Sequence, residues 1–336
     1  MVDISLLSRH ILRELCTDSR VTITELAEKY NVSRHVVKER IEALEREFGL
    51  RYTIEPNYEA LGFDDLHIVR LKFNKKPKPD ALQEIFAKSR VAQIVATTVK
   101  GDLDAIILAV AKNPVEYSQW ETALNSVLAK FGVQIRQSEI NVFHLGFIPI
   151  DGSVIEASNQ EPIYKKMLTI INENSRISIR DLSKQMGVSE ALTRYYFREL
   201  DKSKLIKRYT TIITKSPMKY NIVYFINYTI KSGIERRVER ERRTMYWKQL
   251  QDFPVVSEFP LMLSTSGGDR SFTLANYDDY NKGLEQSVSA HLAAYREDEP
   301  TVRQALIDKV VKGNLPIRNI DQKETYGMVE WTADLV

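Results

Sequence analysis

An internal repeat without gaps divides this chain of 336 residues into two similar units. Residues 19–23 (SRVTI) recur as residues 175–179 (SRISI), and Val32-Ser33 recurs as Val188-Ser189, all at one offset of 156 residues. This period is much longer than the roughly 20–50 residues of solenoid repeats. The repeat therefore indicates the duplication of a two-domain unit rather than an array of small repeats.

Each unit begins with three short helical patterns. In the first unit, Thr22 or Thr24 can cap a second helix, and Ser33 is a suitable N-cap for a third helix that ends near Gly49. The second unit repeats this arrangement with Ser189 as the N-cap. A helix, a tight turn and a capped helix, preceded by a packing helix, is typical of a helix-turn-helix domain. An ordinary three-helix bundle is the alternative, and the presence of two copies favours DNA binding.

Apolar residues alternate with a period of two after each helical domain, which indicates strands. In the first unit the predicted elements are a strand at 66–73, a helix at 79–88, strands at 91–99 and 104–110, a helix at 117–131 and a strand at 133–144. In the second unit they are a strand at 221–230, a helix at 234–250, strands at 255–264 and 272–275, a helix at 277–295 and a strand at 302–311. The βαββαβ order is ferredoxin-like. We therefore predict an α+β protein with two winged helix-turn-helix domains, each followed by a ferredoxin-like domain.

These patterns set the expected domain boundaries. Helix-turn-helix domains are expected at residues 1–60 and 161–219, ferredoxin-like domains at 61–150 and 220–317, a polar linker at 151–160 and a C-terminal extension without a predicted role at 318–336. The longest apolar run, residues 105–111, is far shorter than the roughly 20 residues that span a bilayer. The N-terminus lacks the apolar segment of a signal peptide, and one cysteine, Cys16, excludes an internal disulfide. We expect a cytoplasmic protein without membrane association.

The net charge of +3 is distributed unevenly along the chain. Residues 161–220 contain 13 Lys and Arg against 6 Asp and Glu, a net charge of +7, whereas residues 1–60 contain 9 against 11, a net charge of −2. A concentrated positive charge indicates a polyanionic partner. A basic surface exposed only to solvent is the plainer interpretation.

The third helix of each unit contains the candidate DNA contacts, because this helix of the motif enters the major groove near its N-terminus. The candidates in the first domain are Ser33, Arg34, His35 and Lys38. The candidates in the second domain are Ser189, Thr193, Arg194, Tyr195, Arg198, Lys202, Lys204 and Lys207. The third helix of the first unit also carries glutamates at 39, 42, 45 and 47, which repel phosphate. We therefore expect the second domain to supply most of the affinity for double-stranded DNA, and His35 to be a polar surface residue rather than a pH switch.

Short motifs along the first unit match those of a known family. They are Ile11-Leu12, Asp18-Ser19-Arg20, Glu25-Leu26-Ala27, Val32-Ser33, Arg40-Ile41, Leu61-Gly62 and Gly101-Asp102-Leu103-Asp104. With the helix-turn-helix domain, a short hinge strand and the βαββαβ domain, the chain resembles the leucine-responsive regulatory protein (Lrp/AsnC) family over residues 4–147 and, more loosely, 163–317. Ordinary members have one such unit and assemble through their βαββαβ domains, so this chain resembles two fused units.

The resemblance implies a sequence-specific DNA-binding transcriptional regulator. It also implies that the two ferredoxin-like domains pair inside the chain as they do in the family's homodimer, with pairing between chains as the alternative. Because the two recognition helices differ, the expected DNA site is an imperfect palindrome or asymmetric.

The family binds small effectors, often amino acids, at the interface between paired βαββαβ domains. By resemblance, the effector-site candidates are Gly101, Asp102 and Asp104. A Gly-Asp pair is also a common hairpin signal in its own right. The matching residues 267–271 of the second unit read GGDRS, so the second aspartate is replaced and an equivalent second site is not expected.

The sequence argues against an enzyme. It contains no phosphate-binding glycine loop, zinc-ligand spacing or Gly-x-Ser-x-Gly motif, and its five histidines are scattered, so we expect no catalytic residues, cofactor or metal. Two alternatives stay open. Siroheme decarboxylases resemble Lrp-type units and also occur as fused pairs, and a module without DNA binding would pair with single-unit family members.

Overall fold

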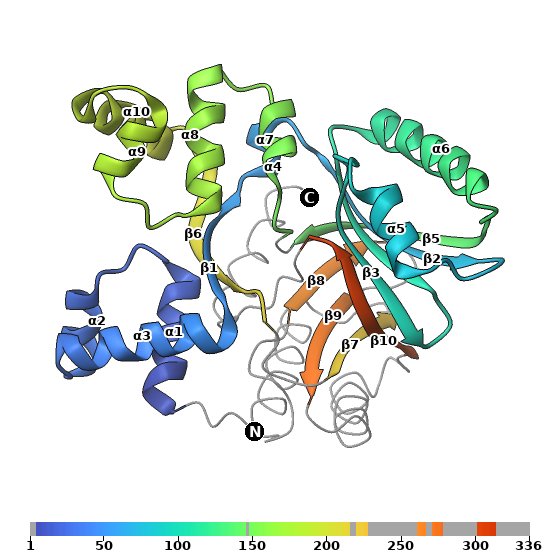
Figure 1. The fold of residues 1–336 in the computed structure, drawn as a ribbon, viewed down its shortest axis with the longest axis horizontal. Helices are drawn as coiled ribbons and strands as arrows, with labels where there is room; N and C mark the ends of the chain where they lie inside the picture. Colours follow the sequence, from blue (N-terminus) through green and yellow to red (C-terminus); the bar gives the residue numbers. More distant parts are fainter. Residues whose placement is uncertain are drawn as a thin grey trace, which may run out of the picture.

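The computed structural model describes residues 5–145, 148–215, 220–227, 261–266, 271–277 and 301–313. Within these ranges, two three-helix bundles lie on one side of the molecule and a β-barrel lies on the other (Figure 1). The helices predicted at 234–250 and 277–295, most of the GGDRS turn and the extension at 318–336 lie outside the described residues.

The first bundle consists of α1 (Leu6–Thr17), α2 (Ile23–Tyr30) and α3 (Arg34–Phe48). Thr22 and Glu25 form a reciprocal capping box that begins α2, and Asn31 ends this helix in the left-handed conformation. Ser33 caps α3 with its side-chain oxygen, and Gly49 ends α3 with a φ of +58°. The predicted helix-turn-helix is therefore confirmed together with its caps.

The second bundle repeats the first with α8 (Pro162–Glu173), α9 (Ile179–Met186) and α10 (Glu190–Lys202). Pro162 occupies the first turn of α8, where its missing N–H group leaves no hydrogen bond unmade. Ser178 caps α9, Gly187 ends it with a φ of +74°, and Ser189 caps α10. Both recognition helices, α3 and α10, thus begin at equivalent serines of the repeat.

Each bundle is followed by a strand that pairs with the strand of the other unit. These strands are β1 (Leu50–Pro56) and β6 (Ile206–Ile213), which form an antiparallel ribbon with Thr53 opposite Thr210. Helix α1 packs against β6, and α8 packs against β1, so the strands are exchanged between the two bundles (Figure 1). The sequence predicts a winged domain in each unit, and the structure forms both wings from one shared ribbon.

Side-chain hydroxyls fasten this ribbon with approximate two-fold symmetry. The Thr53 hydroxyl donates to the carbonyl oxygen of Asn172 at 2.8 Å, and the Thr210 hydroxyl donates to that of Cys16 at 2.6 Å. The hydroxyls of Ser19 and Ser175, which are equivalent in the repeat, lie 2.6 Å apart. All of these contacts are buried, so the two bundles are held as one unit.

The described strands of both units have the strand order of a ferredoxin-like sheet. The first unit contains β2 (Asp65–Phe73), α5 (Pro79–Phe86), β3 (Ala92–Lys100), β4 (Ala105–Ala111), α6 (Pro114–Lys130) and β5 (Ile135–Leu145). The described strands of the second unit are β7 (Tyr220–Asn227), β8 (Leu261–Ser266), β9 (Ser271–Tyr277) and β10 (Thr301–Lys312). The strand orders β5-β2-β4-β3 and β10-β7-β9-β8 are equivalent, as the duplication predicts.

The two sheets join into a closed barrel. Strand β3 pairs with β10, and β5 pairs with β8, both antiparallel. On the outer face of the first sheet, Val69 and Leu71 pack under α5 and α6. On its other face, Ile68 belongs to a second apolar cluster that continues from the barrel into both helical bundles. The barrel and the bundles therefore share one continuous core.

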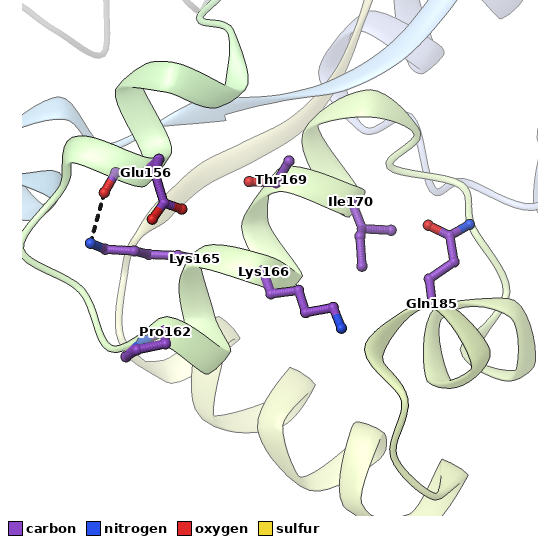
Figure 2. Close-up of a pocket in the computed structure, with 7 residues that line it drawn as sticks. All are labelled: Glu156, Pro162, Lys165, Lys166, Thr169, Ile170 and Gln185. Atoms are coloured by element: carbon purple, nitrogen blue, oxygen red, sulfur yellow. Dashed lines mark hydrogen bonds between the residues drawn. The ribbon is translucent and has the colours of Figure 1, made fainter.

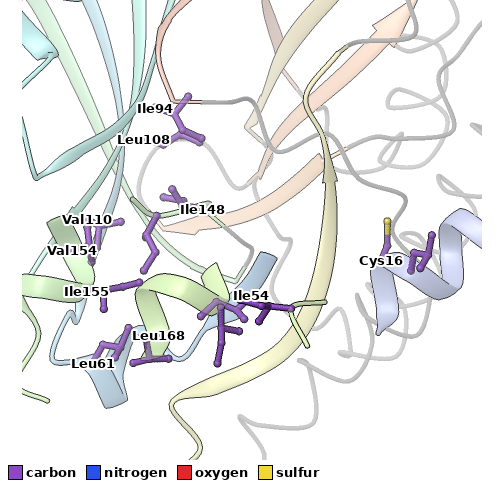
Figure 3. Close-up of a cluster of buried hydrophobic side chains, with 14 of the residues drawn as sticks. Cys16, Ile54, Leu61, Ile94, Leu108, Val110, Ile148, Val154, Ile155 and Leu168 are labelled. Carbon is purple, nitrogen blue, oxygen red and sulfur yellow. The ribbon is translucent and has the colours of Figure 1, made fainter. Parts of the chain in front are cut away.

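The segment expected as a polar linker contains a short helix, α7 (Gly152–Ala157). Val154 and Ile155 of this helix are completely buried and lie near Leu61 of α4 (Tyr58–Leu61) and Leu168 of α8 (Figure 3). The segment between the units is therefore packed into the shared core instead of forming an exposed connection. No helix in the described ranges has the length and apolar character needed to cross a bilayer.

Candidate nucleic-acid interface

The exposed face of α3 carries basic and acidic side chains in pairs. His35 Nε2 lies 3.3 Å from a Glu39 carboxylate oxygen, and Lys38 Nζ lies 3.7 Å from one of Glu42. Such exposed pairs contribute little to stability. They do place two carboxylates beside the candidate DNA contacts, and these negative charges repel a DNA phosphate. Arg34, the remaining basic candidate, is exposed at the first position of α3.

The exposed face of α10 has its acidic residues at the two ends of the helix. Arg194, Tyr195 and Arg198 lie on the exposed middle of this face. Glu190 at the first position lies 3.6 Å from Arg194 Nη2, and Glu199 near the last turn lies 2.8 Å from Lys202 Nζ. The middle of α10 is therefore free of acidic side chains.

The repeat allows the two helices to be compared position by position. At the offset of 156 residues, Lys38 corresponds to Arg194, and Glu42 corresponds to Arg198. Tyr195 corresponds to Glu39, so a second glutamate of α3 is absent from α10. Over their whole lengths, α3 and α10 each have equal numbers of basic and acidic residues. The difference between them is thus the placement of charge on the exposed face rather than the net charge of the helix.

The structure places three predicted contacts in structural roles within the motif. The side-chain oxygens of Ser33 and Ser189 accept hydrogen bonds from Val36 N and Leu192 N, as N-caps do. Thr193 has no exposed surface, and its hydroxyl donates to the carbonyl oxygen of Ser189. The expectation that Thr193 contacts DNA is therefore corrected, because a completely buried side chain cannot reach a base edge.

The basic residues after α10 differ in their surroundings. Lys202 and Lys204 are exposed, and Lys204 has a φ of +56°. Lys207 Nζ lies 2.9 Å from one carboxylate oxygen of Glu55, and the Arg208 guanidinium lies 2.5 Å from the other. Glu55 is 1% exposed, so both cations help to join β6 to β1. Sequence analysis missed Glu55, because its role depends on the pairing of two strands that are far apart in the chain.

The predicted effector residues lie in the turn between β3 and β4. Gly101 has a φ of +112°, and Asp102 is exposed beside it. Asp104 Oδ2 accepts a hydrogen bond from the backbone N–H of Phe73 at 2.9 Å, so this carboxylate fastens the turn to the end of β2. Lys100, just before the turn, is paired with β10. The turn therefore lies where the sheets of the two units meet.

A pocket of about 570 Å³ lies between α7, α8 and α9 (Figure 2). The residues that line it are Glu156, Pro162, Lys165, Lys166, Thr169, Ile170 and Gln185. Lys165 Nζ donates to the carbonyl oxygen of Glu156 at 2.7 Å, and Lys166 Nζ donates to that of Met186 at 3.1 Å. Both ammonium groups thus hold α8 against its neighbours, and the pocket contains none of the predicted site residues. Among the described side chains, no three His, Cys, Asp or Glu residues are placed to hold a metal ion.

Comparisons with known proteins match both helical domains. The family model of the AsnC-type helix-turn-helix domain matches residues 6–45, and a winged helix-turn-helix DNA-binding model matches residues 162–207. An HTH-type transcriptional regulator of Pyrococcus abyssi is 30% identical over 172 residues, which cover 51% of this chain and 96% of that protein. One of Pyrococcus furiosus is 31% identical over 135 residues, covering 40% of this chain and 87% of that protein. Between 40% and 51% of this chain thus aligns with 87% or more of each relative.

Among solved structures, the siroheme decarboxylase NirDL is similar over both units. Its TM-score is 0.57 with 11% sequence identity, and the match covers 97% of this chain and 99% of that chain. At this identity the likeness concerns the fold, which is an arrangement of two units like the one described above.

Proposed function

The chain belongs to the Lrp/AsnC family of helix-turn-helix transcriptional regulators, and we propose that it binds double-stranded DNA mainly through α10 of its second unit. The observation that carries this proposal is that Arg194 and Arg198 lie in the exposed middle of α10 with no acidic residue between them, while Glu190, which lies 3.6 Å from Arg194, is at the first position of the helix. The equivalent positions of α3 include Glu42 and its neighbour Glu39. Arginine donates to guanine or to phosphate, whereas a carboxylate repels phosphate.

We also propose that one chain takes the place of a family homodimer on DNA. The pairing of β3 with β10 and of β5 with β8, together with the shared β1–β6 ribbon, supports this proposal. Two unlike recognition helices in one molecule favour a site with two unlike half-sites. Unbiased selection of binding sites from random duplexes tests this point, and a strictly symmetric operator would contradict it.

The main test compares two double variants with equal changes of charge. Arg194→Ala/Arg198→Ala removes the basic residues of α10, and Arg34→Ala/Lys38→Ala removes those of α3. We expect the α10 variant to lose at least about tenfold in affinity and to lower the slope of log K against log salt by up to about 2, since each phosphate contact contributes about 0.9. The α3 variant should change affinity by less than about threefold, because Lys38 is already paired with Glu42 and the carboxylates of Glu39 and Glu42 repel phosphate on this face.

Fluorescence anisotropy with genomic and random duplexes across a salt series measures both quantities. Lys75→Ala/Lys130→Ala is the matched control, since both lysines are exposed, Lys75 two residues after β2 and Lys130 at the end of α6, and these elements lie away from the helical bundles (Figure 1). An equal loss for the α3 and α10 variants, or a larger loss for α3, would refute the assignment of α10 as the main DNA contact.

The turn at residues 101–104 is the proposed effector site, and its place beside β10 supports this. A ligand at this junction contacts both sheets and can change the geometry of the barrel. The test is thermal denaturation with a panel of amino acids, using Asp102→Ala as the variant. A ligand that raises the Tm of the wild type and not of the variant supports the site, and equal shifts for both would contradict it.

A second candidate function is decarboxylation of a tetrapyrrole. The whole-chain likeness of fold to NirDL is the observation that favours it. Another NirDL structure is a co-complex with an iron-uroporphyrin III analogue, which supplies a probe. A change in the visible absorbance of that compound on addition of this protein, without DNA binding at low salt, would favour the enzyme. If the protein shows no DNA binding and causes no spectral change, the results would favour a module that pairs with single-unit relatives.

A further inference from the structure

Two large apolar side chains are exposed on the recognition helix of the second unit. Leu192 is 39% exposed and Tyr195 is 51% exposed. They are three residues apart in the first two turns of α10, and therefore lie on neighbouring parts of one surface. Single exposed apolar residues are common on soluble proteins. What distinguishes this pair is its position, beside Arg194 and Arg198 in the part of the helix that enters the major groove.

Neighbouring groups contact the Tyr195 ring and the backbone of Leu192. The Tyr195 ring makes an edge contact with the Tyr196 ring at 5.5 Å, and Tyr196 makes one with Tyr164 of α8 at 6.0 Å. The backbone N–H of Leu192 donates to the side chain of Ser189, the cap that begins α10. The Tyr195 ring is therefore held by its neighbours, and Leu192 projects from the capped start of the helix.

We propose that Leu192 contacts the 5-methyl group of a thymine in the major groove, with the Tyr195 ring packed beside it. This inference rests on the proposed function, because it requires α10 to lie in the groove. The thymine methyl group is the apolar group that base pairs present there, whereas the other exposed edges are hydrogen-bond donors and acceptors. The flanking arginines favour DNA over an apolar protein partner for this surface.

The equivalent positions of the first unit lack this surface. Val36 stands where Leu192 stands in α10, but it is smaller and only half-exposed, and Glu39 stands where Tyr195 does. The selection of thymine is therefore a property of the half-site under α10. When the two half-sites differ, this contact places α10 on the half-site that contains the thymine and so fixes the orientation of the protein on the DNA.

The test replaces each thymine of the preferred duplex in turn by deoxyuridine, which removes the 5-methyl group and keeps the base pairing. Wild-type protein should lose about fourfold in affinity at one or two thymines of a single half-site, the value expected for one methyl group transferred from an apolar contact to water. Leu192→Ala should bind the thymine and deoxyuridine duplexes equally. Val36→Ala is the matched control and should keep the full sensitivity of the wild type.

The outcomes separate this inference from the proposed function. Tight DNA binding that is insensitive to deoxyuridine at every position would overturn the inference and leave DNA binding intact. An unchanged sensitivity in Leu192→Ala would overturn the assignment of this side chain, and the salt slope of the variant shows that its phosphate contacts are retained. Absence of duplex binding by the wild type at low salt would overturn both proposals. Circular dichroism of each variant confirms that it is folded.

Discussion

The hydroxyls that fasten the β1–β6 ribbon allow a quantitative test of its energetics. Thr53→Val and Thr210→Val each replace a buried hydroxyl by a methyl group of similar size, and valine is as well suited to a strand as threonine. Each change removes a hydrogen bond to a backbone carbonyl, that of Asn172 or that of Cys16. Both hydroxyl-bearing residues are fully buried, so water cannot replace the lost donor.

The expected cost follows from this burial. A net hydrogen bond contributes about 0.5–1.5 kcal/mol, and a buried partner left without a donor costs about 1–3 kcal/mol. We expect each variant to lower the free energy of unfolding by about 2 kcal/mol. The approximate two-fold symmetry of the ribbon relates the two sites. Because the Thr53 hydroxyl also lies 2.9 Å from Asn172 Oδ1, its loss should cost as much as that of the Thr210 hydroxyl or up to about 1 kcal/mol more.

Urea denaturation followed by far-UV circular dichroism measures these changes. Thr122→Val is the matched control, because the Thr122 hydroxyl donates to the carbonyl oxygen of Ser118 at 2.9 Å on the exposed surface of α6. Water can take over that bond, so the control should change stability by less than about 0.5 kcal/mol. A loss in Thr210→Val no larger than in Thr122→Val would refute the argument from burial. A loss in Thr53→Val clearly smaller than in Thr210→Val would refute their relation by symmetry.

Two further predictions concern the first bundle. Burial favours the protonated form of Glu14, but hydrogen bonds from Lys29 and Tyr30 outweigh it and hold the pKa of this carboxyl below its usual range. A lowered pKa stabilises the fold above the unfolded value of about 4.3, and the effect is lost as the pH falls through the folded value. Glu14→Gln should therefore cost less than about 1 kcal/mol at neutral pH, since Lys29 is exposed and Glu14 is only half-buried, and this cost should diminish as the pH falls below about 4, as measured by urea denaturation across pH. An undiminished cost at low pH would contradict this. Gly49→Ala should destabilise by about 1–2 kcal/mol, because φ is +58° and the added Cβ would lie 2.5 Å from Thr214 Oγ1; an unchanged Tm would show that the end of α3 adapts.

Local chemistry made much of the fold predictable. Ser33 and Ser189 mark the starts of both recognition helices, and Gly49 marks the end of α3, because caps depend only on residues a few positions apart. Alternating apolar residues likewise located the strands. The exchange of β1 and β6 between the units was not predicted, since a strand does not specify its partner within its own residues.

Two expectations that differ from the structure, Thr193 as a DNA contact and residues 151–160 as a polar linker, could have been corrected from the sequence. The repeat matches Thr193 with Val37, an apolar residue on the core face of α3, so Thr193 also belongs to a buried position. The adjacent apolar residues Val154 and Ile155 interrupt the polar segment 151–160. Two adjacent large apolar side chains indicate burial rather than a solvated linker. By contrast, Glu55 corresponds to Thr211 in the other unit at the offset of 156 residues, and no local pattern indicates that this carboxylate is buried between two cations.

The closed barrel has a consequence for how this regulator responds to its own abundance. A single-unit protein must meet a second copy before its sheet edges are covered, so its active form increases with the square of concentration when it is scarce. Here β3 and β5 find their partners in the same polypeptide, and dilution does not separate them. Occupancy of a site should then rise in direct proportion to the number of molecules in the cell. If α10 binds DNA as proposed, a substitution in it affects one half-site, whereas in a symmetric dimer the same substitution affects both.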